Sequence, residues 1–535
     1  MHDHFHYNTG KLAKFIGKRE IVITLIWFII SVALSVCVIW AFENIFQSGE
    51  QHIGIAETMK NPAMTVMVGP AYGIDNYNTG AMMGHMMLLF SIIGIIIMNI
   101  FMVVRHTRSD EEKGRLEVIR SLPVGRLANL SATMIVCFII NTIIALALGV
   151  SISLLGVSSM TLEGCMLFGV VIGMTGILFG AITAVFVQLS SNSRGAIGYS
   201  FMFLGIAYIV RGIGDVSSEI LSLISPLGLP LRTSVFVDNS WWPILLIGLL
   251  TIIVLVFAFY LNAKRDLGEG LIPAKKGKAI ASQAMLSPFG FARKLLRTQI
   301  IWWAIALFTL GVTYGSVFGD IDKFLEGNEM LQQMFVNTEG GITIAESFMS
   351  VIMVIMSIVS SIPAISAILR IRKEEKEGRL EHILSRNVSR NKFFACFLII
   401  AIFTSIIMMI FTGLGLWLAS YPVMAEPMAI GTVISSAVVH IPAIMVMIGI
   451  AMILITYLPR HTGIVWGYLG FSFLGVYLGS LLDFPKWFIR LSPYGNVPQV
   501  PAERFSLATA LILIGIATTL FTISFIGYKR RDIAN

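Results

Sequence analysis

Long apolar segments separated by short polar ones make up almost the whole chain. About twelve of them reach the roughly 20 residues that a helix needs to cross a bilayer. In the first half they lie at about 21–42, 84–104, 129–156, 163–189, 196–213 and 241–262, and in the second at about 298–318, 343–369, 393–420, 430–457, 462–482 and 506–528. Barrel strands would be shorter and would alternate in polarity. The pattern therefore predicts an all-α membrane protein with about twelve transmembrane helices.

A charged segment recurs between the second and third apolar segments of each half. Glu111–Glu117 returns 264 positions later as Glu375–Glu381, and from 111 to 126 nine of sixteen residues are identical to those at 375–390. We call 111–126 the first island and 375–390 the second island. The recurrence predicts two fused six-helix direct repeats: a first half at 1–262, a cytoplasmic basic linker with an interfacial helix at 263–296, and a second half at 297–535.

Composition and charge place the chain in a bilayer with a defined orientation. Of 535 residues, 56% are hydrophobic and 13% charged, against about 25% charged in soluble domains. With the N-terminus inside, cytoplasmic segments hold 31 of the 38 Lys and Arg residues, so we expect both termini and both islands to be cytoplasmic. This bias explains the net charge of +8. The expected counterions are anionic lipids, and a nucleic-acid partner is not needed.

Two basic segments are expected at the membrane surface. Lys11–Arg19 places Leu12, Phe15 and Ile16 on one helical face, which predicts an interfacial helix on the inner leaflet, and Phe289–Gln299 is similar. The polar linker between the halves also suits a lipid-binding basic patch, and the two interpretations are compatible.

Glycine and proline mark two further features. Gly169, Gly173, Gly176 and Gly180 form a row in the fourth apolar segment, which we interpret as a helix-packing face rather than a substrate groove. Each half also has a Ser-Pro-x-Gly motif after its fifth segment, with Pro226 and Gly228 in the first and Pro493 and Gly495 in the second. Short re-entrant or interfacial helices are expected there, with a simple outside loop as the alternative.

Candidate catalytic and metal-binding chemistry is sparse. The four cysteines are dispersed without a CxxC pair, and Gly17-Lys18 and Gly277-Lys278 lack the rest of a phosphate-binding loop. His2, His4 and His6 could hold a metal, but a disordered tail is the favoured interpretation. Few carboxylates lie at membrane depth, where an ion-coupled transporter would need them. We therefore predict no catalytic residue and no cofactor on this chain, and an external energy source.

The first island resembles the cytoplasmic coupling segment of type-two ABC exporter permeases. The matching positions are Glu111, Gly114, Leu116, Glu117, Ile119, Pro123, Val124 and Arg126. The second island is similar but has Asn387 in place of the proline. With its fused halves, the chain resembles the polyketide-antibiotic exporter permeases associated with resistance to tetronasin-like polyether ionophores. This resemblance implies a bacterial plasma-membrane permease, a lipophilic substrate, and two copies of a separately encoded ABC ATPase that binds ATP and Mg²⁺.

The islands themselves suit docking to a soluble partner. Positions 110–121 are expected to form three helical turns, with Leu116 and Ile119 as an apolar ridge, ended by Pro123 and Gly125. The residues expected to couple to the ATPase are Glu111, Gly114, Arg115, Leu116, Glu117 and Ile119 in the first copy and Glu375, Gly378, Arg379, Leu380, Glu381 and Ile383 in the second. The alternatives are a solvated charged loop, a secondary transporter of parallel-repeat type, and a membrane scaffold or sensor.

Overall fold

The structure is all-helical wherever it describes the chain. The computed structural model describes residues 5–45, 49–60, 62–273, 280, 282–320, 344–385, 388–424, 427–477 and 485–531. No strand occurs in these ranges. Within these described ranges, eleven helices are long and apolar enough to cross a membrane, and Ile464–Val476 is a shorter apolar helix. The prediction of an all-α membrane protein with about twelve transmembrane helices is confirmed.

The chain divides into two compact units, Met1–Gly277 and Lys278–Asn535. The boundary lies inside the segment 263–296. Each unit has its own apolar core, made largely of residues from its long helices. Each unit is therefore described by itself.

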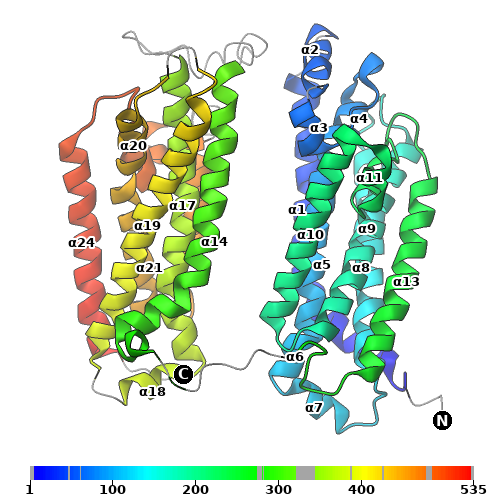
Figure 1. Ribbon diagram of the computed structural model, residues 1–535, viewed down its shortest axis with the longest axis horizontal. Helices are drawn as coiled ribbons and strands as arrows, with labels where there is room; N and C mark the ends of the chain where they lie inside the picture. Colours follow the sequence, from blue (N-terminus) through cyan, green and yellow to red (C-terminus); the bar gives the residue numbers. More distant parts are fainter. Residues whose placement is uncertain are drawn as a thin grey trace. The chain divides into compact units, whose positions relative to one another are not determined.

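Unit 1 is a bundle of long helices with short helices at both ends (Figure 1). Its long elements are α1 (Thr9–Ile45), α5 (Leu88–His106), α8 (Ala128–Ser153), α9 (Leu162–Leu189), α10 (Ser193–Ser217) and α13 (Trp242–Lys264). A π-helical turn (Met83–Met87) joins α4 (Thr79–Met82) to α5. Its short elements are α2 (Gly49–Met59), α3 (Pro62–Val68), a 3₁₀ turn (Ile74–Asn76), α6 (Arg108–Glu112), α7 (Arg115–Arg120), α11 (Glu219–Ile224) and α12 (Gly228–Leu231). We call the end that carries α6 and α7 the charged end of unit 1.

Unit 2 repeats this order. Its long elements are α14 (Pro288–Ser316), α17 (Ile344–Lys376), α19 (Arg390–Ser420), α21 (Ile441–Tyr457) and α24 (Leu507–Arg530), and the shorter apolar helix is α22 (Ile464–Tyr477). Its short elements are α18 (Arg379–Leu384), α20 (Ile430–Val438), α23 (Lys486–Arg490) and 3₁₀ turns at Gln283–Leu286, Val317–Asp320 and Pro493–Asn496. The end that carries α18 is the charged end of unit 2 (Figure 1).

The expected separate interfacial helices are wrong. Lys11–Arg19 forms the first turns of α1, which runs unbroken for 37 residues and so extends about 55 Å. Leu12 and Ile16 are buried against unit 1, whereas Phe15 is exposed. Phe289–Gln299 is likewise continuous with α14. Since no residue breaks the helix between the amphipathic turns and the apolar ones, the basic face simply continues the spanning helix.

The predicted span at 430–457 is one candidate span, but its helix is interrupted at residues 439–440. Helix α20 ends at Val438 and α21 begins at Ile441, with Pro442 in its first turn. Proline has no N–H for the bond to the preceding turn and its ring displaces the carbonyl there. His440 lies fully buried at this break, and its Nδ1 is 3.0 Å from the Ser436 carbonyl oxygen.

Candidate functional site

Both islands are broken by a glycine in the left-handed conformation. Gly114 has φ 68° and precedes α7, and Gly378 has φ 69° and precedes α18. A Cβ built on either glycine meets nothing within 4 Å, so the backbone conformation rather than crowding favours glycine there. The expected single helix over 110–121 is therefore wrong, because the chain forms α6, a left-handed turn and then α7.

Leu116, Ile119 and their counterparts Leu380 and Ile383 face their own units. Leu116 and Leu380 keep only 5% and 1% of their surface exposed. Ile119 and Ile383 are partly buried against the cores of units 1 and 2. The expectation that Leu116 and Ile119 form an apolar ridge for a partner is therefore wrong for Leu116, which is buried, and Ile119 is half-buried. The left-handed glycine changes the helix direction, so the face that carries Leu116 points inward.

The outward face of each island is formed by other side chains. Glu117 and Glu381 occupy equivalent positions and are exposed. In the first island Val118 and Leu122 are 69% and 60% exposed. In the second, His382 stands at the position of Val118. A partner that contacts both islands would thus meet a glutamate at each, beside an apolar patch in one and a histidine in the other.

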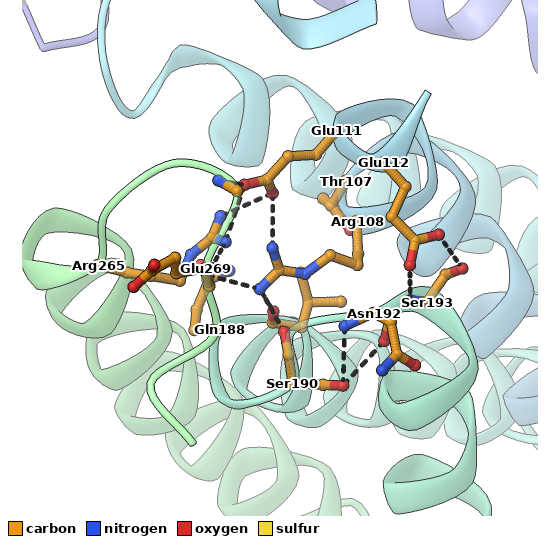
Figure 2. Close-up of polar contacts among 12 residues, drawn as sticks. Thr107, Arg108, Glu111, Glu112, Gln188, Ser190, Asn192, Ser193, Arg265 and Glu269 are labelled. Atoms are coloured by element: carbon orange, nitrogen blue, oxygen red, sulfur yellow. Dashed lines mark hydrogen bonds and ion pairs between the residues drawn. The ribbon is translucent and has the colours of Figure 1, made fainter. Parts of the chain in front are cut away.

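Glu111 anchors the first island to the end of the last long helix of unit 1 (Figure 2). Arg265, which directly follows α13, donates to both carboxylate oxygens of Glu111 at 3.0 and 2.9 Å. The Gly268 N–H donates to Glu111 Oε1 at 2.6 Å, and Arg108 Nη1 lies 3.2 Å from Oε2. The side chains of Glu111 and Arg265 are each 7% exposed. This is a buried, bidentate and charge-assisted contact.

The second island has the same anchor. Arg531, which directly follows α24, places Nη2 3.0 Å from Glu375 Oε2. Arg372 Nη1 lies 3.2 Å from the same oxygen, as Arg108 does from Glu111. The Tyr528 hydroxyl adds a third donor at 3.0 Å to Oε1. The ion pair is therefore duplicated along with the island.

A second carboxylate ties the two sides of each glycine turn together. Asp110 accepts from Arg115 at 2.9 Å, and its counterpart Glu374 accepts from Arg379 at 2.5 and 2.9 Å. The hydrogen bond to Glu374 raises the pKa of the Arg379 guanidinium. Asp110 also accepts from Arg19 of α1 at 2.7 Å. The turn at each glycine is thus closed by an ion pair within the island.

Arginines also connect the islands to other helix ends. Arg108 Nη2 donates to the carbonyls of Val187, at 3.1 Å, and Ser190, at the C-terminus of α9 (Figure 2). In unit 2, Arg372 Nε donates to the Pro459 carbonyl at 3.1 Å and Arg531 Nη1 to the Ile455 carbonyl at 2.7 Å, at the C-terminus of α21. Cations are favoured at these unsatisfied carbonyls.

A further pair of arginines completes the correspondence. Arg126 donates to the Arg265 carbonyl at 3.0 Å, and Arg390 donates to the Arg531 carbonyl at 2.7 Å. Each charged end therefore joins its island to the ends of two long helices of the same unit. A force applied to the island would reach α9 and α13 in unit 1, and α21 and α24 in unit 2.

The residues that complete the anchors were not singled out from the sequence. Arg265 and Arg531 lie about 150 residues from their carboxylates, so local spacing could not pair them. A signal was present, since Arg108 and Arg372 stand at the offset of 264 that relates the islands, and Arg265 and Arg531 stand at 266. Extending the repeat comparison beyond the islands would have found them.

The glycine row lies against α8. A Cβ added at Gly169 would stand 2.0 Å from the Ala145 carbonyl oxygen, and one at Gly173 would stand 2.9 Å from that of Asn141. At Gly176 and Gly180 it would meet Asn141 Oδ1 at 2.4 Å and Cys137 Sγ at 2.9 Å. Beside the row, Asn99 and Asn141 exchange two side-chain hydrogen bonds at 3.0 and 2.8 Å, a buried pair that sequence reasoning missed.

The Ser-Pro-x-Gly motifs lie far from the islands. Pro226 lies between α11 and α12, and Gly228 begins α12. Pro493 and Gly495 belong to the 3₁₀ turn that follows α23. Among the predicted sites, the structure thus brings together the residues within each island but places the glycine row and these motifs elsewhere.

The metal-site alternative concerns residues that are only partly described. His2 and His4 lie outside the described residues, and Asn387 of the second island does as well. His6 Nδ1 is 2.9 Å from the Ser131 hydroxyl. No cluster of metal-ligating side chains occurs in the described part of the chain.

Comparison with known proteins connects the whole chain to drug efflux. The multidrug efflux system permease protein Rv1217c of Mycobacterium tuberculosis (strain ATCC 25618 / H37Rv) is 31% identical over 528 residues, which cover 98% of this chain and 95% of that protein. The model of the protein family described as the C-terminal domain of multidrug efflux system permease Rv1217c matches residues 285–529. The chain belongs to the family of multi-pass multidrug efflux permeases represented by Rv1217c.

Proposed function

We propose that this chain is the membrane-spanning subunit of an ATP-driven ABC exporter, in which each island contacts one separately encoded ATPase subunit. The observation that carries the proposal is the duplicated anchor. The same carboxylate-arginine pair, Glu111–Arg265 and Glu375–Arg531, joins an exposed island to the helix ends of each unit.

The anchors suit the transmission of movement rather than chemistry. Buried ion pairs hold each island on its own unit, while Glu117 and Glu381 remain exposed for a partner. The sequence contains no phosphate-binding loop of the GxxxxGK[ST] type, so ATP and Mg²⁺ belong to the partner in this proposal. Closure of an ATPase pair would move both islands and, through the anchors, the long helices.

Orientation and substrate follow from the same proposal. Both islands and both termini are placed in the cytoplasm, in agreement with the Lys and Arg bias of the sequence. The substrate is a lipophilic or amphipathic compound drawn from the membrane, of the antibiotic or ionophore kind. Family membership supports efflux of drugs, and the apolar character of the spanning helices supports a lipophilic cargo.

Reversal of the two exposed glutamates tests the proposal. The full chain is co-expressed with the candidate ATPase, purified in detergent, and the mass of the complex is measured by light scattering. We expect two ATPase subunits per wild-type chain, and loss of both the ATPase and drug efflux in the double variant Glu117→Arg, Glu381→Arg. Neither side chain takes part in the anchors, so the fold should be retained.

The control matches the change in charge at other exposed positions. Asp75→Arg with Asp238→Arg also adds four charges, in unit 1 but away from the charged end. This variant should keep both ATPase subunits and full efflux. Retention of the ATPase by the island variant, or efflux in cells that lack the ATPase, would refute coupling through the islands and favour an ion-coupled transporter. ATPase binding without any drug flux would instead favour a scaffold.

A further inference from the structure

Three cations at the start of α14 line a groove on unit 2. Arg293, Lys294 and Arg297 stand along one wall of a cavity of about 560 Å³ between α14 and α19. The rest of its lining is mostly apolar and includes Ile301 and Phe403, which are 45% and 58% exposed. A second hollow of about 270 Å³ shares Lys294, Arg297 and Ile301 with the first. The groove therefore has positively charged side chains on one side and an apolar surface beside them.

These cations differ from those of the corresponding helix in unit 1. At the start of α1, Arg19 pairs with Asp110, and the adjacent Glu20 pairs with Arg105 at 2.8 Å. In unit 2 the counterpart of Asp110 is Glu374, whose partners are Arg370 and Arg379.

Among the described residues of unit 2, the cations of α14 have no anionic partner. No carboxylate lies within ion-pair distance of Arg293, Lys294 or Arg297 in the part of unit 2 that the structure describes. The duplication has kept the basic segment, but the acidic counterpart Glu374 pairs with Arg370 and Arg379 instead. Three clustered cations above an apolar groove call for an anionic ligand from outside the chain.

The order of residues along α14 matches the layers of a phospholipid. The cations come first, Ile301 and the 66% exposed Trp302 follow within about 8 Å along the helix, and the aliphatic wall continues toward Ile407 on α19. Tryptophan is enriched at the level of lipid head groups, and lysine and arginine attract anionic lipids there. Since α14 is itself a candidate membrane span, the groove opens where acyl chains would lie.

The helix pair explains why the groove exists. Toward the other end of the pair, α14 and α19 pack backbone to backbone, because a Cβ at Gly311 would stand 2.3 Å from the Thr412 carbonyl oxygen and one at Gly415 would stand 2.3 Å from that of Phe308. Near the charged end, larger residues such as Phe289 and Phe403 line the space between the helices. The helices are close at the glycines and hollowed at the cations.

We propose that this groove binds one anionic glycerophospholipid of the bilayer, with its phosphate at Arg293, Lys294 and Arg297 and an acyl chain between α14 and α19. This site is independent of the proposed coupling to an ATPase, because it uses no residue of either island. The hollow in unit 1 that is lined by Glu20 and Arg105 measures only about 90 Å³ and carries its own anion, so we expect the lipid at unit 2 alone.

Lipid binding to the full chain tests the proposal. The purified protein is titrated with palmitoyl-oleoyl phosphatidylglycerol, and bound lipid is counted by native mass spectrometry alongside the shift in melting temperature. The triple variant Arg293→Gln, Lys294→Gln, Arg297→Gln should bind this lipid on the order of a hundredfold more weakly. Phosphatidylcholine, which has no net charge, should bind the wild-type chain no more tightly than it binds the variant.

Two further variants separate the groove from general surface charge. Lys11→Gln, Lys14→Gln, Lys18→Gln removes three cations from α1 and should leave phosphatidylglycerol binding unchanged. Ile407→Trp keeps every cation but fills the groove, and should weaken binding even if the triple variant fails to fold.

The opposite results would overturn the site. Undiminished phosphatidylglycerol binding by the triple variant, equal loss in the α1 variant, or equal binding of phosphatidylcholine would each show that the groove does not recognise an anionic lipid. Equal stabilisation by inorganic phosphate alone would show that a free anion, not a lipid, is the ligand.

Discussion

Replacing Glu111 by Gln should destabilise unit 1 strongly. The substitution keeps the size of the side chain and an acceptor for the Gly268 N–H, but it removes the negative charge between Arg108 and Arg265. Both arginines are then buried near each other without a carboxylate. Breaking a buried ion pair on one side costs about 3–5 kcal/mol. Because glutamine still accepts hydrogen bonds, we expect the lower end of that range, about 3 kcal/mol.

Thermal unfolding in detergent measures this effect. For a unit of this size about 1 kcal/mol corresponds to about 2 °C, so the melting temperature should fall by about 6 °C. The matched control is Glu112→Gln, one residue along, whose exposed carboxylate accepts from the Ser193 N–H at 2.8 Å. Exposed contacts of this kind contribute about 1 kcal/mol or less. A fall of less than about 1 °C in Glu111→Gln, or an equal fall in the control, would refute the anchor.

A double-mutant cycle isolates the pair itself. Arg265→Gln should destabilise by a similar amount, because it removes the bidentate cation from the buried Glu111 carboxylate. Arg108 is then the only cation that still contacts Glu111 among the described residues. The double variant should lose clearly less than the sum of the two single variants, because each single change already breaks the same bidentate contact. Additive losses would mean that the two side chains stabilise the fold independently.

Three other changes test the backbone and the packing of unit 1, each by the melting temperature in detergent. Gly114→Ala should destabilise by about 1–2 kcal/mol through its positive φ alone, and Gly114→Asn by less, so equal losses would contradict the backbone argument. Gly169→Ala forces α8 and α9 apart and should cost more than Gly114→Ala, whereas Gly94→Ala, where nothing lies within 4 Å, should not destabilise. Asn99→Leu removes the donor to Asn141 Oδ1 and one acceptor of Asn141 Nδ2, which keeps the Cys137 carbonyl, and should cost about 0.6–1.7 kcal/mol. Most of this loss should be recovered when Asn141 is also changed to Leu.

The helices and the duplication could be predicted from the sequence because both depend on patterns within one segment. Apolar length predicts a spanning helix, and the recurring charged residues located both islands, although the left-handed turns at Gly114 and Gly378 were not predicted. Charged residues are rare in this chain, so their repetition at a constant offset was informative. These features need no knowledge of which helices are neighbours.

The faces of the islands could not be predicted in the same way. An unbroken helix over 110–121 would place Leu116 outward with the charged rim, but one residue with positive φ redirects the chain and turns Leu116 into the core. The sequence shows the glycine but not whether it adopts this conformation. The anchors could not be predicted either, because Arg265 contacts Glu111 only in the folded helix bundle.

The two units preserve their charged ends more closely than their interiors, and this contrast bears on mechanism. Both anchors keep a carboxylate-arginine pair, although Arg265 contacts both oxygens of Glu111 and Arg531 only one of Glu375. The interiors differ more: unit 1 has the glycine row and the Asn99–Asn141 pair, and unit 2 has a helix interrupted between α20 and α21. Similar anchors fit a mechanism in which the proposed partner moves both units in a similar way. Different interiors fit a substrate path that is not symmetric between the units. The outward faces also differ, with Val118 in one island and His382 in the other. Under the proposed function, we therefore expect the two ATPase contacts to move their units in a similar way but to differ in affinity. Glu117→Arg and Glu381→Arg, made singly, would reveal this difference as unequal losses of bound ATPase.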